Sequence, residues 1–471
     1  MPKASSKAVP ASTLKPFPKP ISLKKMIGPS FLILAFGLGS GELILWPYLT
    51  SNHGLGIIWA ALLGISFQYF IDMEIERYAL VKGESVFVGL ARRLRFAPYW
   101  FILSTFVGFA LPGIIAASAQ ALAAAFGFAE FKWLAIGLLI LLGIILSLGR
   151  TVYSLMEHLT KTLILIGVPF ILLLVLILVD RTSFIAAAQG LIGIGPGYRF
   201  LPESISLLTF LGAFAYSGAA GNLNLSQSIY IREKGYGMGV YSQKIAGMFH
   251  AGALEQEIKL EGEPFASTPQ NRERFQIWWK RMNLEHGLIF WGLGFLAMAL
   301  LMILSYDSVY GQAGNSQGIF FVINQSIRIG SILGPWSGVA LLLVIGVLLL
   351  QTQLGILDST SRMISENVAL KKQQKSGHAR VNLTRIYYIC IWAQVAFGVF
   401  MLALGFEPRA LIVAGAVANA WAMIVHIALV YYLNQRELAP EFRPVLWRRI
   451  VIGIIFVAFL GFGLLTIWSM F

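Results

Sequence analysis

The chain alternates long apolar segments with short polar stretches. A helix rises about 1.5 Å per residue, so about 20 mostly apolar residues are needed to cross a hydrocarbon core about 30 Å thick. About eleven segments approach or meet this length, which predicts an all-α membrane protein. The predicted spans are Lys25–Asn52, Gly56–Ala79, Tyr99–Phe126, Lys132–Leu148, His158–Val179, Pro202–Ile231, Asn283–Tyr306, Pro335–Ile364, Leu383–Leu404, Arg409–Leu433 and Arg449–Met470.

The remaining stretches divide the chain into a core and its flanks. Residues 1–23 are polar, basic and rich in proline, so we expect a flexible cytoplasmic tail. Residues 24–433 form the predicted membrane core, and 434–471 add a linker and one more helix. The longest loop, 232–281, is mixed in charge and is expected to be cytoplasmic. Gln317–Ile329 is too short to span and is predicted to lie as a helix on the outer surface.

The basic residues fix a predicted orientation. With the N-terminus inside, all but five of the 36 Lys and Arg fall on the cytoplasmic side, as the positive-inside rule requires. The five exceptions are Lys132, Arg181, Arg199, Arg328 and Arg409. An odd number of spans then places the C-terminus outside, and we expect the membrane to be the plasma (inner) membrane. The net charge of +14 does not indicate nucleic-acid binding, because the basic residues are dispersed among separate loops.

Two predicted spans contain glycine clusters near their middle. The first has Gly37-Leu38-Gly39-Ser40-Gly41-Glu42, and the sixth has Ser217-Gly218-Ala219-Ala220-Gly221-Asn222. Glycine permits unwound backbone, which a membrane tolerates only where protein buries it or where it lines a cavity. Glycines also serve close helix packing. Two clusters five helices apart, each followed by a polar residue, favour a five-plus-five inverted repeat, here 24–180 and 202–433, with a substrate held between the breaks.

The sequence around these clusters resembles the NRAMP family of divalent-metal transporters. The resemblance rests on Gly28-Pro29-Ser30-Phe31-Leu32, Gly54-Leu55-Gly56, Asn222-Leu223-Asn224-Leu225 and the stretch from Gln351 to Leu370. It extends over about Lys25–Leu433 and implies a LeuT-like transporter fold with broken first and sixth helices. The substrate class that it implies is a divalent cation.

The residues at the breaks depart from that family. Its first-helix motif Asp-Pro-Gly-Asn corresponds to Gly39, Ser40, Gly41 and Glu42, and its sixth-helix Met-Pro-His corresponds to Ala219, Ala220 and Gly221. The soft methionine ligand and the histidine of the proton route are therefore lost. Third-helix carboxylates of the family fall on Ala117 and Gln120. We therefore expect a transporter that resembles this family but lacks its usual proton coupling.

Glu42 is the only carboxylate at either break, and a charged residue inside a membrane is a functional candidate. Carboxylate, amide and carbonyl oxygens suit Mg²⁺ or Ca²⁺, and Mn²⁺ less exclusively. Equally open is a structural role for Glu42, at a helix N-terminus or in a buried ion pair. The candidate binding residues are Gly39, Glu42, Ser217, Ala219, Asn222, Asn224 and Ser226, and the candidate pathway-lining residues are Gln120, Gln351, Gln353 and Asn419.

Other charged residues carry a structural interpretation. Asp72, Glu74 and Glu76 are expected to be solvated charges at the inner end of the second helix, with Glu74 near Arg77, although a gating network is an alternative. Pairing at helical spacing is expected for Asp358, Arg362 and Glu366 in the eighth helix, and His158 is expected to be structural. The single cysteine, Cys390, excludes an internal disulfide.

The sequence contains no catalytic set and no phosphate-binding loop, so we expect no enzyme activity and no resident cofactor. Its partners would be the lipid bilayer and a transported ion or small solute. The first hypothesis is a secondary transporter or facilitator of a divalent cation. A transporter of a small organic solute, such as an amino acid or amine, is the second. A membrane sensor with the long loop as its output surface is the third.

Overall fold

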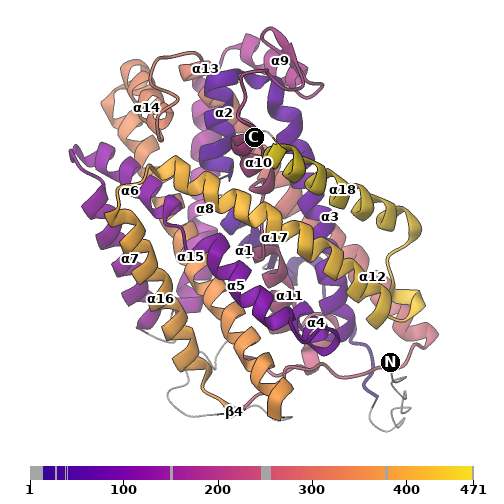
Figure 1. Ribbon diagram of the computed structural model, residues 1–471. Helices are drawn as coiled ribbons and strands as arrows, with labels where there is room; N and C mark the ends of the chain where they lie inside the picture. Colours follow the sequence, from indigo (N-terminus) through magenta and orange to yellow (C-terminus); the bar gives the residue numbers. More distant parts are fainter. Residues whose placement is uncertain are drawn as a thin grey trace.

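The computed structural model is almost entirely helical (Figure 1). It describes residues 14–26, 29–37, 39, 41–148, 152–245, 256–376 and 380–468. Gly28, Leu38, Ser40 and residues 1–13 therefore lie outside the described residues, as does the side chain of His158. Among the described residues, the only strands form two short antiparallel pairs. These are β1 (Ile194–Gly195) with β2 (Tyr198–Arg199), and β3 (Gln256–Glu257) with β4 (Arg380–Val381).

Seven described helical stretches are long and apolar enough to cross a membrane singly, or up to nine with each bent pair counted as one span. They correspond to the second, third and seventh to eleventh predicted segments. Their helices are α3 (Ile58–Lys82) after the short turn η4 (Leu55–Ile57), α5 (Ala97–Phe109) with α6 (Gly113–Phe126), α12 (Pro269–His286) with η7 (Gly287–Leu293) and α13 (Gly294–Val309), α15 (Pro335–Ser376), α16 (Leu383–Ala403), α17 (Pro408–Glu437) and α18 (Leu446–Trp468).

The remaining four predicted segments are interrupted, bent or short. The first consists of α1 (Pro29–Gly37), the π-helical turn η3 (Gly41–Leu45) and α2 (Trp46–His53), bent by 40°. The fourth is α7 (Lys132–Ser147), and the fifth is α8 (Val152–Leu178), followed at 117° by α9 (Arg181–Gly190). The sixth consists of α10 (Leu207–Ala215) and α11 (Leu223–Lys234). The all-α architecture and both interruptions are confirmed.

The broken helices lie between two groups of long helices. On one side α15 packs against α5, α6, α14 and α16, and on the other α3 and α17 contact α11 and α10. Gly346 of α15 allows close approach to α6, because a Cβ at this position would lie 2.7 Å from Leu122 Cγ. Ser118 Oγ of α6 donates to Gly346 O at 2.7 Å. The last helix, α18, lies along the outside of the bundle (Figure 1). Most apolar side chains from these layers form one buried cluster, with the breaks inside it.

The first described N-terminal residues and the end of α18 lie toward opposite ends of the bundle (Figure 1). We call the end with α4 and β4 the lower end, and the end with α9 and α14 the upper end. The predicted surface helix is present as α14 (Phe320–Leu333), which follows a loop at the upper end.

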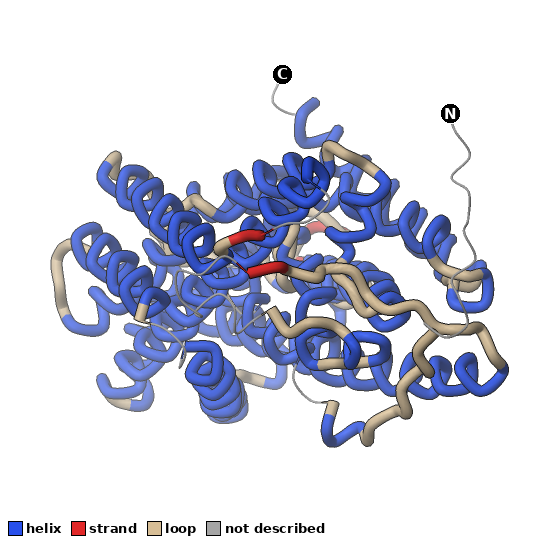
Figure 2. The backbone as a smooth tube through the Cα atoms, turned by 90° about the horizontal axis from the view of Figure 1, so that it is seen from below, coloured by secondary structure: helices blue, strands red, loops and turns tan. Residues whose placement is uncertain are grey.

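The lower end is covered by the long loop and by N-terminal residues. Loop segments and the pair β3–β4 cross this face (Figure 2). The short helices at this end are η2 (Leu23–Lys25), α4 (Val86–Arg93), η5 (Gly237–Tyr241) and η8 (Pro440–Phe442). The loop predicted over 232–281 already becomes helical at Pro269, because Thr268 caps the helix by accepting from Asn271 N at 3.2 Å and Pro269 suits its first turn.

The described part of the predicted flexible tail is packed. Phe17 is fully buried against Phe265 and Phe275, and its backbone N–H donates to Asn271 Oδ1 at 3.2 Å. Trp278 Nε1 donates to Pro18 O at 3.1 Å. The expectation of flexibility therefore does not hold for residues 14–23, because an apolar anchor within this polar stretch is buried against α12.

Candidate functional site

The first break lies where α1 ends and the chain restarts as a π-helical turn. Backbone hydrogen bonds are reorganised here, with Gly39 N donating to Gly37 O and Leu43 N donating to Gly39 O at 3.0 Å. Gly41 is pressed against the second break, since a Cβ placed on it would lie 1.7 Å from Tyr216 O. Only glycine allows the two backbone segments to approach this closely. The two interruptions therefore meet inside the protein.

The second break has unusual backbone angles and a dedicated partner. Ala220 has a φ of +61°, which is uncommon for a residue with a Cβ. Gln68 of α3 spans the interruption, because its Nε2 donates to Ala215 O at 2.6 Å and its Oε1 accepts from Ala220 N at 3.1 Å. One side chain thus satisfies a carbonyl that ends α10 and an amide in the unwound stretch. Gln68 was missed by the sequence analysis, although it is a lone amide among apolar residues of the second span.

Glu42 lies at the first break with its carboxylate fully buried. Within the described residues, neither of its oxygens has a hydrogen-bond partner, and no ion pair joins it to a basic side chain. The backbone of Gly39 and Gly218, and of Glu42 itself, lies close enough to act on the carboxylate electrostatically. The expected alternative of a buried ion pair is therefore not observed, while the helix-terminus alternative stays open.

The other predicted binding residues divide by whether their polar atoms are already engaged. Ser217 Oγ accepts from Trp46 Nε1 at 2.9 Å and donates to Ala213 O at 3.1 Å, which ties α2 to the second break. Ser226 Oγ donates to Leu223 O within its own helix. Ala219 is buried and contributes no polar side-chain atom. A ligand bound by Ser217 or Ser226 would therefore have to replace or share these hydrogen bonds.

Asn222, Asn224 and Asn419 have buried amide atoms without hydrogen-bond partners among the described residues. Asn222 Nδ2 donates to Ser104 Oγ at 2.7 Å, which leaves Oδ1 without a partner, and both amide atoms of Asn224 lack one. Asn419 Nδ2 donates to Gly108 O at 2.8 Å, while its Oδ1 lies against Gly221. Buried amides are normally hydrogen-bonded. Each of the three amides therefore has an oxygen without a partner among the described residues.

The remaining pathway candidates are not all near the breaks. Thr352, between Gln351 and Gln353 on α15, lies against Gly39 and donates to Ala35 O at 3.2 Å. Gln351 and Gln353 are both buried. Gln120 instead lies beside Gly318, in the loop before α14 at the upper end, and its Oε1 has no partner among the described residues.

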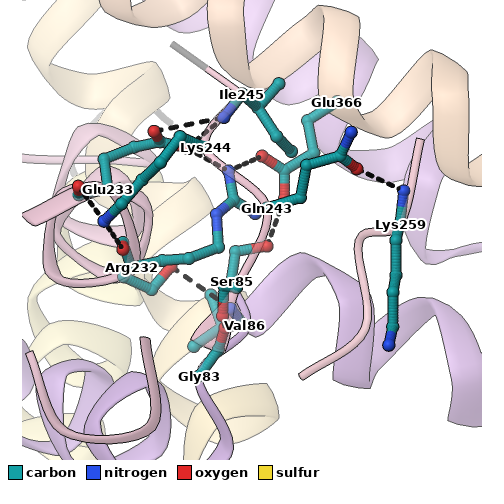
Figure 3. A network of polar contacts seen from close by, with 12 residues as sticks. Gly83, Ser85, Val86, Arg232, Glu233, Gln243, Lys244, Ile245, Lys259 and Glu366 are labelled. Carbon is teal, nitrogen blue, oxygen red and sulfur yellow. Dashed lines mark hydrogen bonds and ion pairs between the residues drawn. The ribbon is translucent and has the colours of Figure 1, made fainter. Parts of the chain in front are cut away.

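A buried ion pair joins α11 to α15 (Figure 3). Arg232 of α11 donates from both terminal nitrogens to the two carboxylate oxygens of Glu366, each at 3.0 Å. Both side chains are 2% exposed. Ser85 Oγ also donates to Glu366, which attaches the loop before α4. We call Arg232, Glu366 and Ser85 the lower clamp. It holds α11, α15 and the loop between α3 and α4 together.

The long loop is fastened to the lower clamp (Figure 3). Glu233 accepts from Ile245 N at 3.1 Å, and Lys244 Nζ donates to Arg232 O at 3.2 Å. Burial lowers the pKa of Lys244, although the neighbouring Glu233 acts in the opposite direction. The expected pairing of Asp358 with Arg362 is confirmed at 2.9 Å, whereas Glu366 pairs with Arg232 instead.

The acidic residues predicted to be solvated at the end of the second helix are buried. Asp72, Glu74 and Glu76 are 0%, 4% and 1% exposed. The expected contact of Glu74 with Arg77 is present at 2.7 Å. Solvation was nevertheless the wrong expectation. The helices α11 and α12 cover Asp72 and Glu76, and α17 and α18 cover Glu74.

Comparisons with known proteins address the fold. No protein-family model and no curated protein matches the sequence. Among solved structures, a variant of the Eremococcus coleocola manganese transporter is 14% identical with a TM-score of 0.64, over 98% of this chain and 90% of that chain. Mhp1, a nucleobase-cation-symport-1 family transporter, is 14% identical with a TM-score of 0.55, over 97% and 95%.

MhsT, solved in complex with L-phenylalanine, gives 12% identity and a TM-score of 0.52, over 94% of this chain and 98% of that chain. The protein has the LeuT fold. At these identities the similarity is one of fold. It nevertheless places the two interruptions in a helical architecture that solved transporters share, and it supports an integral membrane protein.

Proposed function

We propose that this protein is a secondary transporter or facilitator of a divalent cation that works by alternating access. The observation that carries the proposal is Glu42, a fully buried carboxylate between two broken helices with no basic partner among the described residues. Leaving such a charge uncompensated in a membrane is costly. A bound cation would compensate it.

The oxygen donors at the two breaks and in the residues beside them favour a hard cation. Asn222, Asn224 and Asn419 offer amide oxygens, and the interrupted helices offer backbone carbonyls near Gly39 and Gly218. No group of three or more His, Cys, Asp or Glu suited to a metal ion occurs among the described residues. One carboxylate with neutral oxygens is compatible with Mg²⁺, Ca²⁺ or Mn²⁺. We therefore propose a cation from this class as the substrate, in a divergent relative of the NRAMP family.

In the proposed cycle the lower clamp opens and closes one access route. The positive-inside distribution of Lys and Arg supports a cytoplasmic lower end, with the C-terminus outside a plasma or inner membrane. The clamp is formed in this structure, which supports an arrangement that is closed toward that side. The residues of the NRAMP proton route are replaced at the breaks. We therefore propose cation transport that does not use this proton route.

A small organic solute is the second candidate, because MhsT shares the fold and was solved with L-phenylalanine. An organic amine could also pair with Glu42. The close approach of the breaks favours the smaller cation, however. A Cβ placed on Gly37 would lie 3.1 Å from Gly218 and from Glu42 Oε1.

Reconstituted protein in liposomes tests both candidates. Uptake of Mg²⁺, Mn²⁺ and Ca²⁺ is measured for the wild type, for Glu42→Gln and for the matched control Asp307→Asn, whose carboxylate lies near the upper end and accepts from Ser183 Oγ. We expect uptake that Glu42→Gln abolishes and Asp307→Asn retains. Wild-type protein that moves none of these cations but binds an amino acid or amine would overturn the proposal in favour of the second candidate. Absence of both activities would favour a sensor.

A further inference from the structure

An open groove lies between the last two helices, α17 and α18, which pack against each other (Figure 1). Its volume is about 320 Å³. Ile427 and Ala428 of α17 and Ile452, Gly453 and Phe456 of α18 line most of it. None of its lining residues belongs to a broken helix. The groove is therefore separate from the transport site proposed above.

The groove has one polar end and one apolar end. The helix α17 runs down to Glu437, which pairs with α4 at the lower end, and α18 starts there at Leu446. The two polar lining residues, Tyr431 and Arg449, therefore lie below the apolar ones. From Arg449 to Phe456 the groove follows α18 upward for about 10 Å. This polarity matches a phospholipid whose headgroup lies below its acyl chains.

The polar end offers hydrogen-bond donors. Arg449 Nε donates to Pro444 O at 2.7 Å, which fixes the guanidinium. Neither terminal nitrogen of Arg449 has a hydrogen-bond partner among the described residues. One helical turn below Tyr431, Gln435 Nε2 is buried and likewise has no partner in the described structure. Two free guanidinium nitrogens match the geometry of a phosphate group.

The carboxylates near the polar end already have cationic partners. Glu74 lines a small adjoining cavity together with Arg449, but it is bound by Arg77 at 2.7 Å and by Arg448 at 3.2 Å. Glu437 is paired with basic side chains of α3 and α4. No acidic side chain in the described part of the chain forms an ion pair with Arg449. The positive charge of Arg449 is therefore available to a ligand.

A second basic residue extends this positive charge. Arg436 is exposed and lies 5.9 Å from the ring centroid of Tyr432. Ala428, Tyr432 and Arg436 are spaced by four residues, so they form one stripe along α17 below the groove. A zwitterionic headgroup would place its own cation beside Arg436 and Arg449, whereas a headgroup with a net negative charge would not. The local charge therefore favours an anionic phospholipid.

We propose that this groove binds an anionic phospholipid, with the phosphate at Arg449 and one acyl chain along Gly453. Gly453 leaves room for the chain, because a Cβ at this position would meet no described atom within 4 Å. The bound lipid joins α17 to the first turns of α18, where Arg448 contacts Glu74. This site does not depend on the proposed transport function.

Lipid binding by the purified full chain tests the headgroup site. Phosphatidylglycerol and phosphatidylcholine with identical acyl chains are titrated separately in detergent, and bound lipid is measured by native mass spectrometry. We expect the wild type to prefer phosphatidylglycerol. Arg449→Gln should weaken its binding about five-fold, because one arginine near a membrane surface contributes this much.

The matched control for the headgroup site is Arg385→Gln. Arg385 is an exposed basic residue in the first turn of α16, at the same end of the bundle and outside the groove. This variant should bind phosphatidylglycerol as the wild type does. Equal binding of the two lipids by the wild type, or an equal affinity of Arg449→Gln and the wild type for phosphatidylglycerol, would overturn the proposal.

Gly453→Leu tests the position of the acyl chain, because the added side chain would occupy the groove without a clash. The matched control is Gly461→Leu, on the same helix, where a Cβ also has no described neighbour within 4 Å. Thermal unfolding is measured with phosphatidylglycerol, with inorganic phosphate and without additive. We expect phosphatidylglycerol to raise the melting temperature of the wild type and Gly461→Leu, and to raise that of Gly453→Leu much less. Full stabilisation of Gly453→Leu, or equal stabilisation by inorganic phosphate, would overturn the lipid site.

Discussion

The two broken helices perform different tasks in the same architecture. The first contributes the buried carboxylate of Glu42, which has no hydrogen-bond partner in the described structure, and its lower half-helix α1 is held through Ser30 by titratable groups. The second has no charge at its break, and Gln68 bridges its backbone. Its lower half-helix α11 ends in the ion pair of the lower clamp. The first helix thus supplies electrostatic chemistry, and the second supplies a fixed frame.

This difference suggests which half-helix moves more easily. A bidentate guanidinium–carboxylate pair remains charged over the physiological pH range, because arginine does not deprotonate. A hydroxyl held between a histidine and a glutamate depends on how many protons the histidine carries. We therefore expect α1 to respond to pH and α11 to respond chiefly to the loss of its clamp. The following substitutions test that contrast.

The largest effect is expected from Arg232→Met, because it leaves Glu366 buried without its cationic partner. Breaking a buried ion pair by removing one member costs about 3–5 kcal/mol. Chemical unfolding in detergent micelles should show this loss in the free energy of unfolding. The matched control is Arg93→Met, whose side chain is 43% exposed and whose partner is Glu437. That control should cost at most about 1 kcal/mol.

The double variant Arg232→Met with Glu366→Met distinguishes clamp loss from general damage. Both partners become apolar, so much of the stability should return. Liposomes carrying this double variant should admit a soluble thiol reagent to a cysteine placed near the breaks from the lower side, in a Cys390-free background. A single Arg232→Met variant as stable as the wild type would contradict the assignment of the clamp.

Gly41→Ala tests the contact between the two breaks. The added Cβ would lie 1.7 Å from Tyr216 O, a backbone atom that cannot rotate away. Overpacking of this kind costs about 1–3 kcal/mol, and we expect the upper end of that range. The matched control is Gly137→Ala in α7, where a Cβ has no neighbour within 4 Å. Equal thermal stability of the two variants would show that the breaks do not meet as described.

Gln68→Leu tests the frame of the second break. It leaves Ala215 O and Ala220 N without their partner, and an unsatisfied buried group costs about 1–3 kcal/mol. Since both backbone groups can shift slightly, we expect Gln68→Leu to lower the free energy of unfolding by about 2 kcal/mol in total. Gln68→Glu retains an acceptor for Ala220 and loses the donor to Ala215, so it should fall between Gln68→Leu and the wild type. A wild-type melting temperature for Gln68→Leu would refute the bridging role.

The sequence was sufficient for the architecture because its signals are local. Runs of apolar residues predict the spans, and the clusters around Gly39 and Gly218 predict the interruptions without any knowledge of packing. The partners of the breaks could not be predicted in this way. Gln68 meets Ala215 from 147 positions earlier, and His286 meets Asp72 only because α12 packs on α3.

The sequence also did not reveal which charged and aromatic side chains are buried. Charges near a helix end are solvated unless another element covers them, and α11 and α12 cover Asp72 and Glu76. Phe17, inside a polar tail, was likewise read as flexible because its binding surface on α12 lies far along the chain. Sequence patterns therefore predicted which helices break, while the polar contacts around the breaks required the structure.

The smallest effect is expected at an ion-pair network that touches neither broken helix. Glu437, at the end of α17, pairs with Arg92 at 3.1 Å, Lys82 at 3.6 Å and Arg93. Burial acts to raise the pKa of Glu437, but the bond from Arg93 and the three neighbouring cations lower it overall. A carboxyl with a lowered pKa stabilises the folded state above its unfolded pKa, and this contribution is lost as pH falls through the folded value.

Acidification through the glutamate range should therefore lower the free energy of unfolding by at most about 1 kcal/mol, because the paired side chains of Arg92 and Arg93 are partly exposed to solvent. Glu437→Gln should remove that part of the pH dependence of unfolding and leave the response of α1 to pH unchanged. The measurement is the free energy of unfolding against pH, alongside thiol accessibility of a cysteine on α1. If Glu437→Gln abolished the pH response of α1, the contrast between a titratable first helix and a permanently clamped second one would have to be abandoned.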